Sequence, residues 1–187
     1  TGGMAEVWRA RSYGLAGFEK ILVIKKVLDS LAKDDDFIRL FIDEARISVQ
    51  LLHVNIVQVF DLDQVDGTYF MAMEYVHGMD LARLVSRSRH HSSFPLPLAL
   101  FVVTEVLKAL EFAHERTDEG GDPLHIVHCD ISPQNVLVSF SGEVKITDFG
   151  ISRAAFQAKG LHEVVRRKYA YMSPEQVAGD PLDGRSD

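Results

Sequence analysis

The chain lacks several features that would assign it to a large class of proteins. Its one cysteine, Cys129, cannot form an internal disulfide, and such usage is typical of a reducing compartment. No apolar run approaches the length of a membrane span and no secretory signal opens the chain, so we expect a cytoplasmic location without a membrane segment. The 20 lysines and arginines are outnumbered by 27 aspartates and glutamates, and the net charge of −7 argues against nucleic-acid binding. The 187 residues, 47% of them hydrophobic, suffice for one or two lobes.

The centre of the chain does contain a dense group of oxygen-bearing side chains. Two carboxylates and an amide, Asp130, Asn135 and Asp148, surround two β-branched runs at Asn135–Ser139 and Glu143–Thr147. A serine–glycine turn joins the runs, which predicts a small hairpin with a polar loop at each outer end. Converging oxygen ligands without cysteine or histidine suit Mg²⁺ bound together with substrate phosphates. The stretch therefore indicates phosphoryl transfer.

The same stretch resembles the catalytic core of a protein kinase. The motif His128-Cys129-Asp130, with Asn135 five residues beyond the aspartate, precedes Asp148-Phe149-Gly150. The resemblance is greatest to the bacterial serine/threonine kinases of eukaryotic type, and it covers essentially the whole chain. It implies an α+β fold in two lobes with ATP between them. We expect a small antiparallel sheet with one helix over residues 1–75 and a larger, mainly helical lobe over residues 76–187, both incomplete.

The resemblance gives each polar residue of the core a role. Asp130 would orient the substrate hydroxyl and accept its proton, while Asn135 and Asp148 would hold Mg²⁺ across the β- and γ-phosphates. Lys25, oriented by Glu44, would bind the α- and β-phosphates. Carboxylates suit a hydroxyl or a metal, an amide oxygen suits a metal, and an ammonium suits phosphate.

Lys25 and Glu44 belong to two predicted elements, a strand at Glu19–Val27 and a helix at Asp36–Leu52. Leu-Val-Ile-Lys, ending at Lys25, resembles the strand motif that carries the phosphate-binding lysine. Neighbouring strand residues face opposite sides, so only one of Lys25 and Lys26 can point into the site, and the motif selects Lys25. The alternatives are a surface lysine whose stem covers apolar neighbours and a solvated helix glutamate.

The nucleotide contacts that the resemblance implies come from several stretches. They are Gly2, Gly3 and Val7 in a glycine-rich loop, Lys25, Met73 beside the deep pocket, Glu74 and Val76 at the adenine edge, Asp80 at the ribose, and Leu137. Ala5 stands where the loop pattern has its third glycine, and taken alone this piece fits a plain turn before a strand better than a phosphate-binding loop. Asp80 is also a good N-cap for a helix at Leu81–Val85.

Three further elements are predicted from periodicity. Ile56–Asp63 and Thr68–Tyr75 are expected as strands around an Asp-Gly turn. Pro97–His114 has the 3.6-residue period of a long core helix, with Leu98 and Phe101 among its expected buried positions.

The sequence departs from the kinase pattern beside the catalytic aspartate. Cys129 stands where many kinases have an arginine that pairs with a phosphate on the activation segment. Between residues 153 and 172 there is no serine or threonine, and Tyr169 and Tyr171 are the only residues there that can be phosphorylated. The segment lacks a serine or threonine to carry a phosphate, and the chain lacks the arginine that would bind it. We therefore expect activity without phosphorylation of this segment.

A second departure concerns charge at the γ-phosphate. Serine/threonine kinases usually carry a lysine two residues after the catalytic aspartate, where this chain has Ser132. Lys168 falls where a threonine is usual, so we expect Lys168 to supply the missing positive charge. The alternative is a basic, substrate-facing loop that also includes Arg166 and Arg167.

The function implied is an ATP- and Mg²⁺-dependent kinase that phosphorylates serine and threonine of protein substrates. A pseudokinase, which binds nucleotide as a scaffold and transfers little or no phosphate, is the first alternative. A small-molecule phosphotransferase is a second, disfavoured by the Asp-Phe-Gly motif and by Ser173-Pro174-Glu175, which resembles the end of a kinase activation segment. The oligomeric state stays open.

Overall fold

The computed structural model describes residues 5–88, 93–149 and 169–187. The chain forms two compact units. The first unit is Thr1–Gln50 with Gln58–Tyr75, and the second is Leu51–Val57 with Val76–Asp187. A boundary between lobes at residue 75 stays a prediction.

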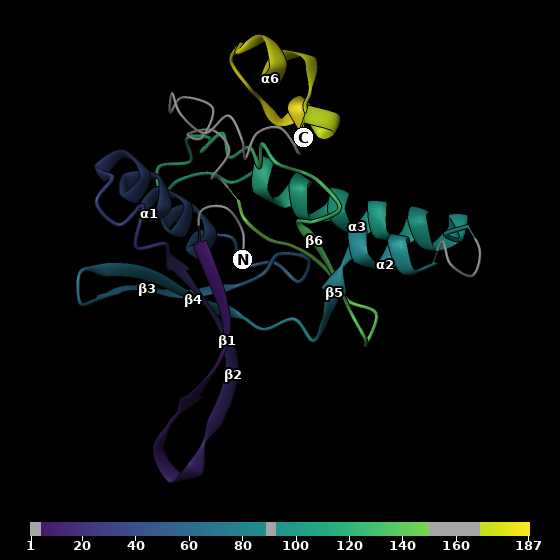
Figure 1. The fold of residues 1–187 in the computed structure, drawn as a ribbon. Helices are drawn as coiled ribbons and strands as arrows, with labels where there is room; N and C mark the ends of the chain where they lie inside the picture. Colours follow the sequence, from purple (N-terminus) through teal and green to yellow (C-terminus); the bar gives the residue numbers. More distant parts are fainter. Residues whose placement is uncertain (1–4, 89–92, 150–168) are drawn as a thin grey trace. The chain divides into compact units, whose positions relative to one another are not determined.

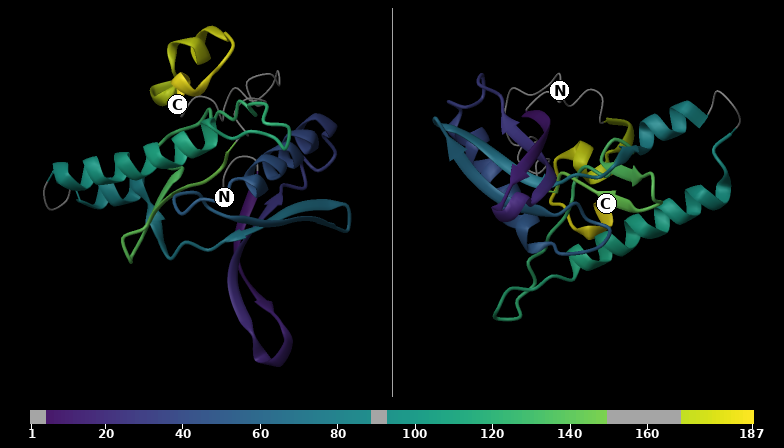
Figure 2. Two further views of the ribbon diagram at one scale, coloured as in Figure 1. Left: turned by 180° about the vertical axis from the view of Figure 1, so that it is seen from behind. Right: turned by 90° about the horizontal axis from the view of Figure 1, so that it is seen from below.

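The first unit contains a four-stranded antiparallel sheet in the order β1-β2-β4-β3. Its strands are β1 (Ala5–Tyr13), β2 (Glu19–Val27), β3 (Val59–Val65) and β4 (Thr68–Glu74). The β1–β2 hairpin is a long ribbon that extends beyond the other two strands, as Figures 1 and 2 show. The β3–β4 turn has Asp66 at φ 49° and Gly67 at φ 80°, the two positive values that a tight hairpin turn with the twist of its strands requires.

Helix α1 (Asp35–Gln50) supplies the apolar face that covers part of this sheet. Asp34 accepts a hydrogen bond from the Phe37 backbone N–H at 3.0 Å, and two further aspartates lie in the first turn, where the helix dipole favours negative charge. Phe37, Phe41 and Ala45 recur at a spacing of four residues and are buried. The helix contacts β3.

The second unit contains a three-stranded antiparallel sheet in the order β5-β6-β7 and several helices. The strands are β5 (Gly78–Asp80), β6 (Val136–Ser139) and β7 (Val144–Ile146). The helices are α2 (Leu81–Ser88), α3 (Leu96–His114), α6 (Pro174–Ala178) and the 3₁₀ turns η2 (Tyr169–Tyr171) and η3 (Gly184–Ser186). The hairpin predicted in the centre of the sequence is confirmed, with Gly142 at φ 92° in its turn.

The short segment Leu51–Val57 belongs to the second unit through specific bonds. The Asn55 side-chain Nδ2 donates to Glu105 Oε2 at 2.8 Å and to the Val144 carbonyl at 2.9 Å. Ile56 forms a parallel bridge with Ile146 of β7. The prediction of one strand over Ile56–Asp63 is therefore wrong at its start, because Ile56 pairs in a different sheet from β3.

Helix α3 is buried on one face only. Val102, Val106 and Leu110 are buried and the helix contacts β7, whereas Leu98 and Phe101, both predicted to be buried, are 51% and 47% exposed. The prediction was wrong for these two residues because periodicity identifies an apolar stripe but not which part of it is covered. None of the helices among the described residues has the length and hydropathy needed to cross a bilayer.

The close approach of β5 to β6 generates a stability prediction. A Cβ atom at Gly78 would lie 2.0 Å from the Val138 carbonyl oxygen, which is backbone and cannot rotate away. We expect Gly78→Ala to lower the free energy of unfolding by about 2 kcal/mol or more, measured by urea denaturation. Gly120→Ala is the control, since its Cβ would meet only the Asp118 side chain at 3.2 Å, and we expect a change within about 0.5 kcal/mol. Equal midpoints for the two variants would contradict the prediction.

Candidate active site

In the first unit, Lys25 and Glu44 form a buried ion pair. Lys25 Nζ lies 2.8 Å from Glu44 Oε1, and the two side chains are 8% and 2% exposed. The adjacent Lys26 faces the other side of β2 and pairs with Asp29 at the surface. The pairing of Lys25 with Glu44 that the resemblance implies is present, and the surface-lysine alternative does not fit a buried side chain.

Three other candidate residues of this unit lie on the strands around Lys25. Val7 is the cross-strand partner of Lys25, and Met73 is the partner of Val23, so both side chains lie on the Lys25 face of the sheet. Met73 is buried, whereas Val7 is largely exposed. Glu74, the last residue of β4, donates its backbone N–H to the Gln58 carbonyl at 2.8 Å.

The second unit brings Asp80 and Leu137 together as cross-strand partners on β5 and β6. The Asp80 carboxylate accepts a hydrogen bond from the Arg83 backbone N–H at 2.8 Å, so the prediction of a helix N-cap is confirmed. Val76 lies between β4 and β5 and is half-buried. Contacts of these residues with a nucleotide stay predictions.

Asp130 and Asn135 are joined directly. The Asn135 side-chain Nδ2 donates to the Asp130 carbonyl at 2.8 Å and to Asp130 Oδ2 at 2.8 Å. Because the same nitrogen makes both bonds, the orientation of the amide is fixed and its oxygen points away from Asp130. The Asn135 carbonyl accepts the Thr147 backbone N–H at 3.0 Å, so the residue before Asp148 is bonded to the residue that holds Asp130.

Asp148, two residues after the end of β7, has a left-handed backbone conformation. Its φ is 65°, a value that is unusual for a residue other than glycine. The next residue, Phe149, is fully buried and its ring packs on the His128 ring with centroids 4.6 Å apart. The packing of these two rings connects the Asp130 loop to the Asp148 segment.

His128 is a neutral, fully buried residue of this core. Its Nε2 lies 3.0 Å from the Thr147 carbonyl and its Nδ1 accepts the Asp130 backbone N–H at 3.2 Å, which requires the tautomer protonated at Nε2. Burial lowers the pKa of His128 because the charged imidazolium loses its hydration, although the nearby Asp187 acts in the opposite direction. The histidine therefore supports the backbone of the loop and carries no charge at neutral pH.

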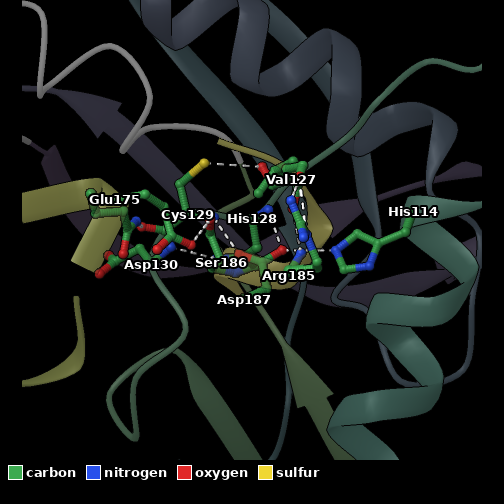
Figure 3. A network of polar contacts seen from close by, with 11 residues as sticks. His114, Val127, His128, Cys129, Asp130, Glu175, Arg185, Ser186 and Asp187 are labelled. Carbon is green, nitrogen blue, oxygen red and sulfur yellow. Dashed lines mark hydrogen bonds and ion pairs between the residues drawn. The ribbon is translucent and has the colours of Figure 1, made fainter. Parts of the chain in front are cut away.

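Asp187 organises the same loop from the end of the chain, as Figure 3 shows. One carboxylate oxygen accepts the Cys129 backbone N–H at 2.8 Å, and the other accepts the His128 backbone N–H at 2.8 Å. His114 Nε2 lies 2.9 Å from the second oxygen. Sequence reasoning missed this role, although Asp187 stands where the kinase pattern has an aspartate. Gln176, which bonds the Cys129 carbonyl, was also missed.

Some predicted site residues cannot be placed. Gly2, Gly3 and Lys168 lie outside the described residues, and Gly150 of the Asp-Phe-Gly motif does too. Cys129 and Ser132, the two departures from the kinase pattern, are both buried. Within the described ranges, histidine, cysteine and acidic side chains form no group of three that could hold a metal ion.

Comparisons with known proteins give a consistent result. The family described as "Protein kinase domain" matches residues 1–187. The chain is 44% identical to the tyrosine-protein kinase MasK of Myxococcus xanthus and 35% identical to the serine/threonine-protein kinase PrkC of Bacillus subtilis. Both matches cover all of this chain, but they cover only 29% of MasK and 27% of PrkC. The crystal structure of the Mycobacterium tuberculosis PknI kinase domain matches with a TM-score of 0.73 and 29% identity, over all of this chain and 65% of that one. The likeness confirms the expected α+β, two-lobed fold class.

The two neighbouring lysines of β2 give a direct test of the buried ion pair. Glu44→Ala removes the carboxylate beside a buried ammonium, so we expect the free energy of unfolding to fall by about 3 kcal/mol. Asp29→Ala removes the partner of Lys26, where the side chains are 38% and 84% exposed, and we expect a change below about 1 kcal/mol. Chemical denaturation of both variants measures the difference. Similar losses would show that burial does not distinguish the two pairs.

Proposed function

Because the chain belongs to the protein kinase domain family, we propose that it transfers the γ-phosphoryl group of ATP to serine and threonine hydroxyls of protein substrates. The observation that carries the proposal is the double hydrogen bond from Asn135 to Asp130, together with the hydrogen bond that Thr147, the residue before Asp148, donates to the Asn135 carbonyl. It supports a site in which the catalytic aspartate and both metal ligands are tied to one rigid network. The chain spans less than a third of the curated relatives named above, so the activity of the whole protein is part of the proposal.

Asp130 acts on the substrate hydroxyl in this proposal. A carboxylate accepts the hydroxyl hydrogen bond and then the proton, as the bond from the hydroxyl oxygen to the γ-phosphorus forms and the bond from that phosphorus to ADP breaks. The Asn135 amide and the His128 ring hold the side chain and the backbone of Asp130, respectively. Little side-chain motion is then needed at the moment of reaction, which is how positioning lowers a barrier.

The side chains beside Asp130 suit a magnesium ion bound with a nucleotide. Because Asn135 Nδ2 donates to Asp130, the amide oxygen of Asn135 points away from Asp130. Asp148 supplies a carboxylate. Amide and carboxylate oxygens are ligands that Mg²⁺ prefers. When bound, magnesium–ATP supplies the phosphoryl group and a counter-charge for its oxygens. Asn135 and Asp148 would hold the metal.

The first unit supplies a cation for phosphate. The Lys25 ammonium, oriented by Glu44, would bind the α- and β-phosphates, and the buried pair supports this role because its position is fixed before any ligand arrives. The remaining nucleotide contacts proposed are Gly2, Gly3, Val7, Met73, Glu74, Val76, Asp80 and Leu137. Lys168 is proposed as the second cation near the γ-phosphate.

Transfer to tyrosine is a second candidate function. The relative with 44% identity is named a tyrosine-protein kinase, whereas the relative with 35% identity is named a serine/threonine-protein kinase. The chemistry of Asp130 serves either hydroxyl, so the residues of the core do not choose between them. The acceptor is decided by phosphoamino-acid analysis of the product.

The central test is Asp130→Asn in the full-length protein. The amide keeps the size of the side chain but cannot take a proton, so we expect phosphate transfer from labelled ATP to a protein substrate to fall by about 100-fold or more. Asp122→Asn, an exposed carboxylate of the same unit, is the control and is expected to match the wild type. A wild-type protein that binds ATP but transfers no phosphate would replace the proposal by a pseudokinase.

Lys168 has its own test. Lys168→Met keeps a long side chain and removes the charge, so we expect turnover to fall at least about ten-fold, a barrier change of about 1.4 kcal/mol. Lys33→Met removes an exposed lysine of the other unit and should leave turnover unchanged. An unchanged rate for Lys168→Met would leave Lys168 as a surface charge.

A further inference from the structure

The peptide group that joins Cys129 to Asp130 is held at both of its polar ends by side chains. Its N–H, from Asp130, donates to His128 Nδ1 at 3.2 Å. Its carbonyl, from Cys129, accepts a hydrogen bond from Gln176 Nε2 at 2.7 Å. This peptide directly precedes the Cα atom of Asp130, so its orientation sets the direction in which the Asp130 side chain leaves the backbone.

The backbone at this point needs support. Cys129 has φ 65°, a left-handed conformation that is unfavourable for a residue with a Cβ. Such a conformation persists only where surrounding contacts impose it. Asp187 holds the N–H side of Cys129, and Gln176 holds its C=O side. The two residues therefore support different faces of one strained turn.

The Gln176 side chain is held by burial and by hydrogen bonds at both ends of its amide. It is 6% exposed, and both ends of its amide are used, because Oε1 accepts the Ser173 backbone N–H at 2.9 Å while Nε2 reaches Cys129. The Ser173 hydroxyl in turn accepts the Gln176 backbone N–H, which completes a capping box at the start of α6. A capping box alone needs only the oxygen of the side chain, and a glutamate supplies that oxygen equally well. The Nε2 donor is the part of Gln176 that the cap does not require.

We propose that Gln176 is a positioning residue for phosphoryl transfer, which orients Asp130 by donating its amide hydrogen to the Cys129 carbonyl. The inference rests on the proposed function of Asp130 and adds to it a dependence of the catalytic aspartate on α6. Gln176 touches neither substrate nor nucleotide in this proposal. Its effect is on kcat, because the residues proposed to bind ATP do not include it.

The deciding variant is Gln176→Glu. Glutamate keeps an oxygen for the Ser173 N–H, so the capping box and the helix remain, but an ionised carboxylate cannot donate to the Cys129 carbonyl. We expect kcat to fall about ten-fold or more at pH 8 with the KM for ATP within two-fold of the wild type. Gln176→Glu and Gln176→Met should therefore lose kcat alike at this pH, because neither side chain donates to the Cys129 carbonyl.

Two further variants separate positioning from helix stability. Gln176→Met has no donor at any pH, so its kcat ratio to the wild type should stay low and independent of pH. Val177→Ala changes an exposed residue of the same helix and should match the wild type. A wild-type kcat for Gln176→Met, or for Gln176→Glu at pH 8, would overturn the proposal and leave Gln176 with a structural role only. So would a loss confined to the KM for ATP.

A measurement without turnover keeps this inference distinct from the proposed function. Amide hydrogen exchange of Asp130, followed by NMR in the full-length protein or a segment proven to fold, should be about ten-fold faster in Gln176→Met than in the wild type. Unchanged exchange would overturn the positioning role whether or not the protein transfers phosphate. Faster exchange together with an inactive wild type would support the role of Gln176 in the loop and reject the proposed function.

Discussion

The left-handed turn at Cys129 is the constraint on which the rest of the site depends. A buried backbone that leaves regular structure must still satisfy its N–H and C=O groups, and at this turn side chains form bonds to both kinds of group. Asp187 takes two N–H groups, Gln176 donates to the carbonyl, and His128 accepts the N–H of Asp130. The loop that carries Asp130 therefore depends on residues that lie 47 and 58 positions further along the chain.

Sequence reasoning succeeded where a local pattern determines the outcome. The bounds of β2 match the predicted strand, and the turn between β6 and β7 was identified from its serine and glycine. A local rule also showed that only one of Lys25 and Lys26 can face the site, because adjacent strand residues face opposite sides of a sheet, and the family motif selected Lys25. The pairing with Glu44 needed more, since only a family motif connects a strand lysine to a helix glutamate across 19 positions.

The parts that could not be predicted depend on contacts between distant segments. Nothing in the letters around Ile56 shows that it pairs with Ile146 and not with the strand that follows it. The apolar stripe of α3 is visible in the sequence, but the exposure of Leu98 and Phe101 depends on which neighbours are present. Gln176 looks like an ordinary member of a capping box, and only the coordinates show that its nitrogen reaches Cys129.

The hydrogen bonds that hold the turn at Cys129 also explain how this position can do without the arginine that is usual in kinases. Asp187 and Gln176 bind the N–H and the carbonyl of Cys129, which every residue other than proline possesses, and so their support does not depend on the side chain at this position. The Cys129 thiol points to the Val127 carbonyl at 3.5 Å and is buried, an environment in which a charged guanidinium would need a buried partner. A small side chain is therefore compatible with an intact turn. The proposal that activity does not require a phosphate on the activation segment has a physical basis here: the hydrogen bonds described for the loop that carries Asp130 involve Asp187, Gln176 and His128, and none of these bonds needs a phosphate.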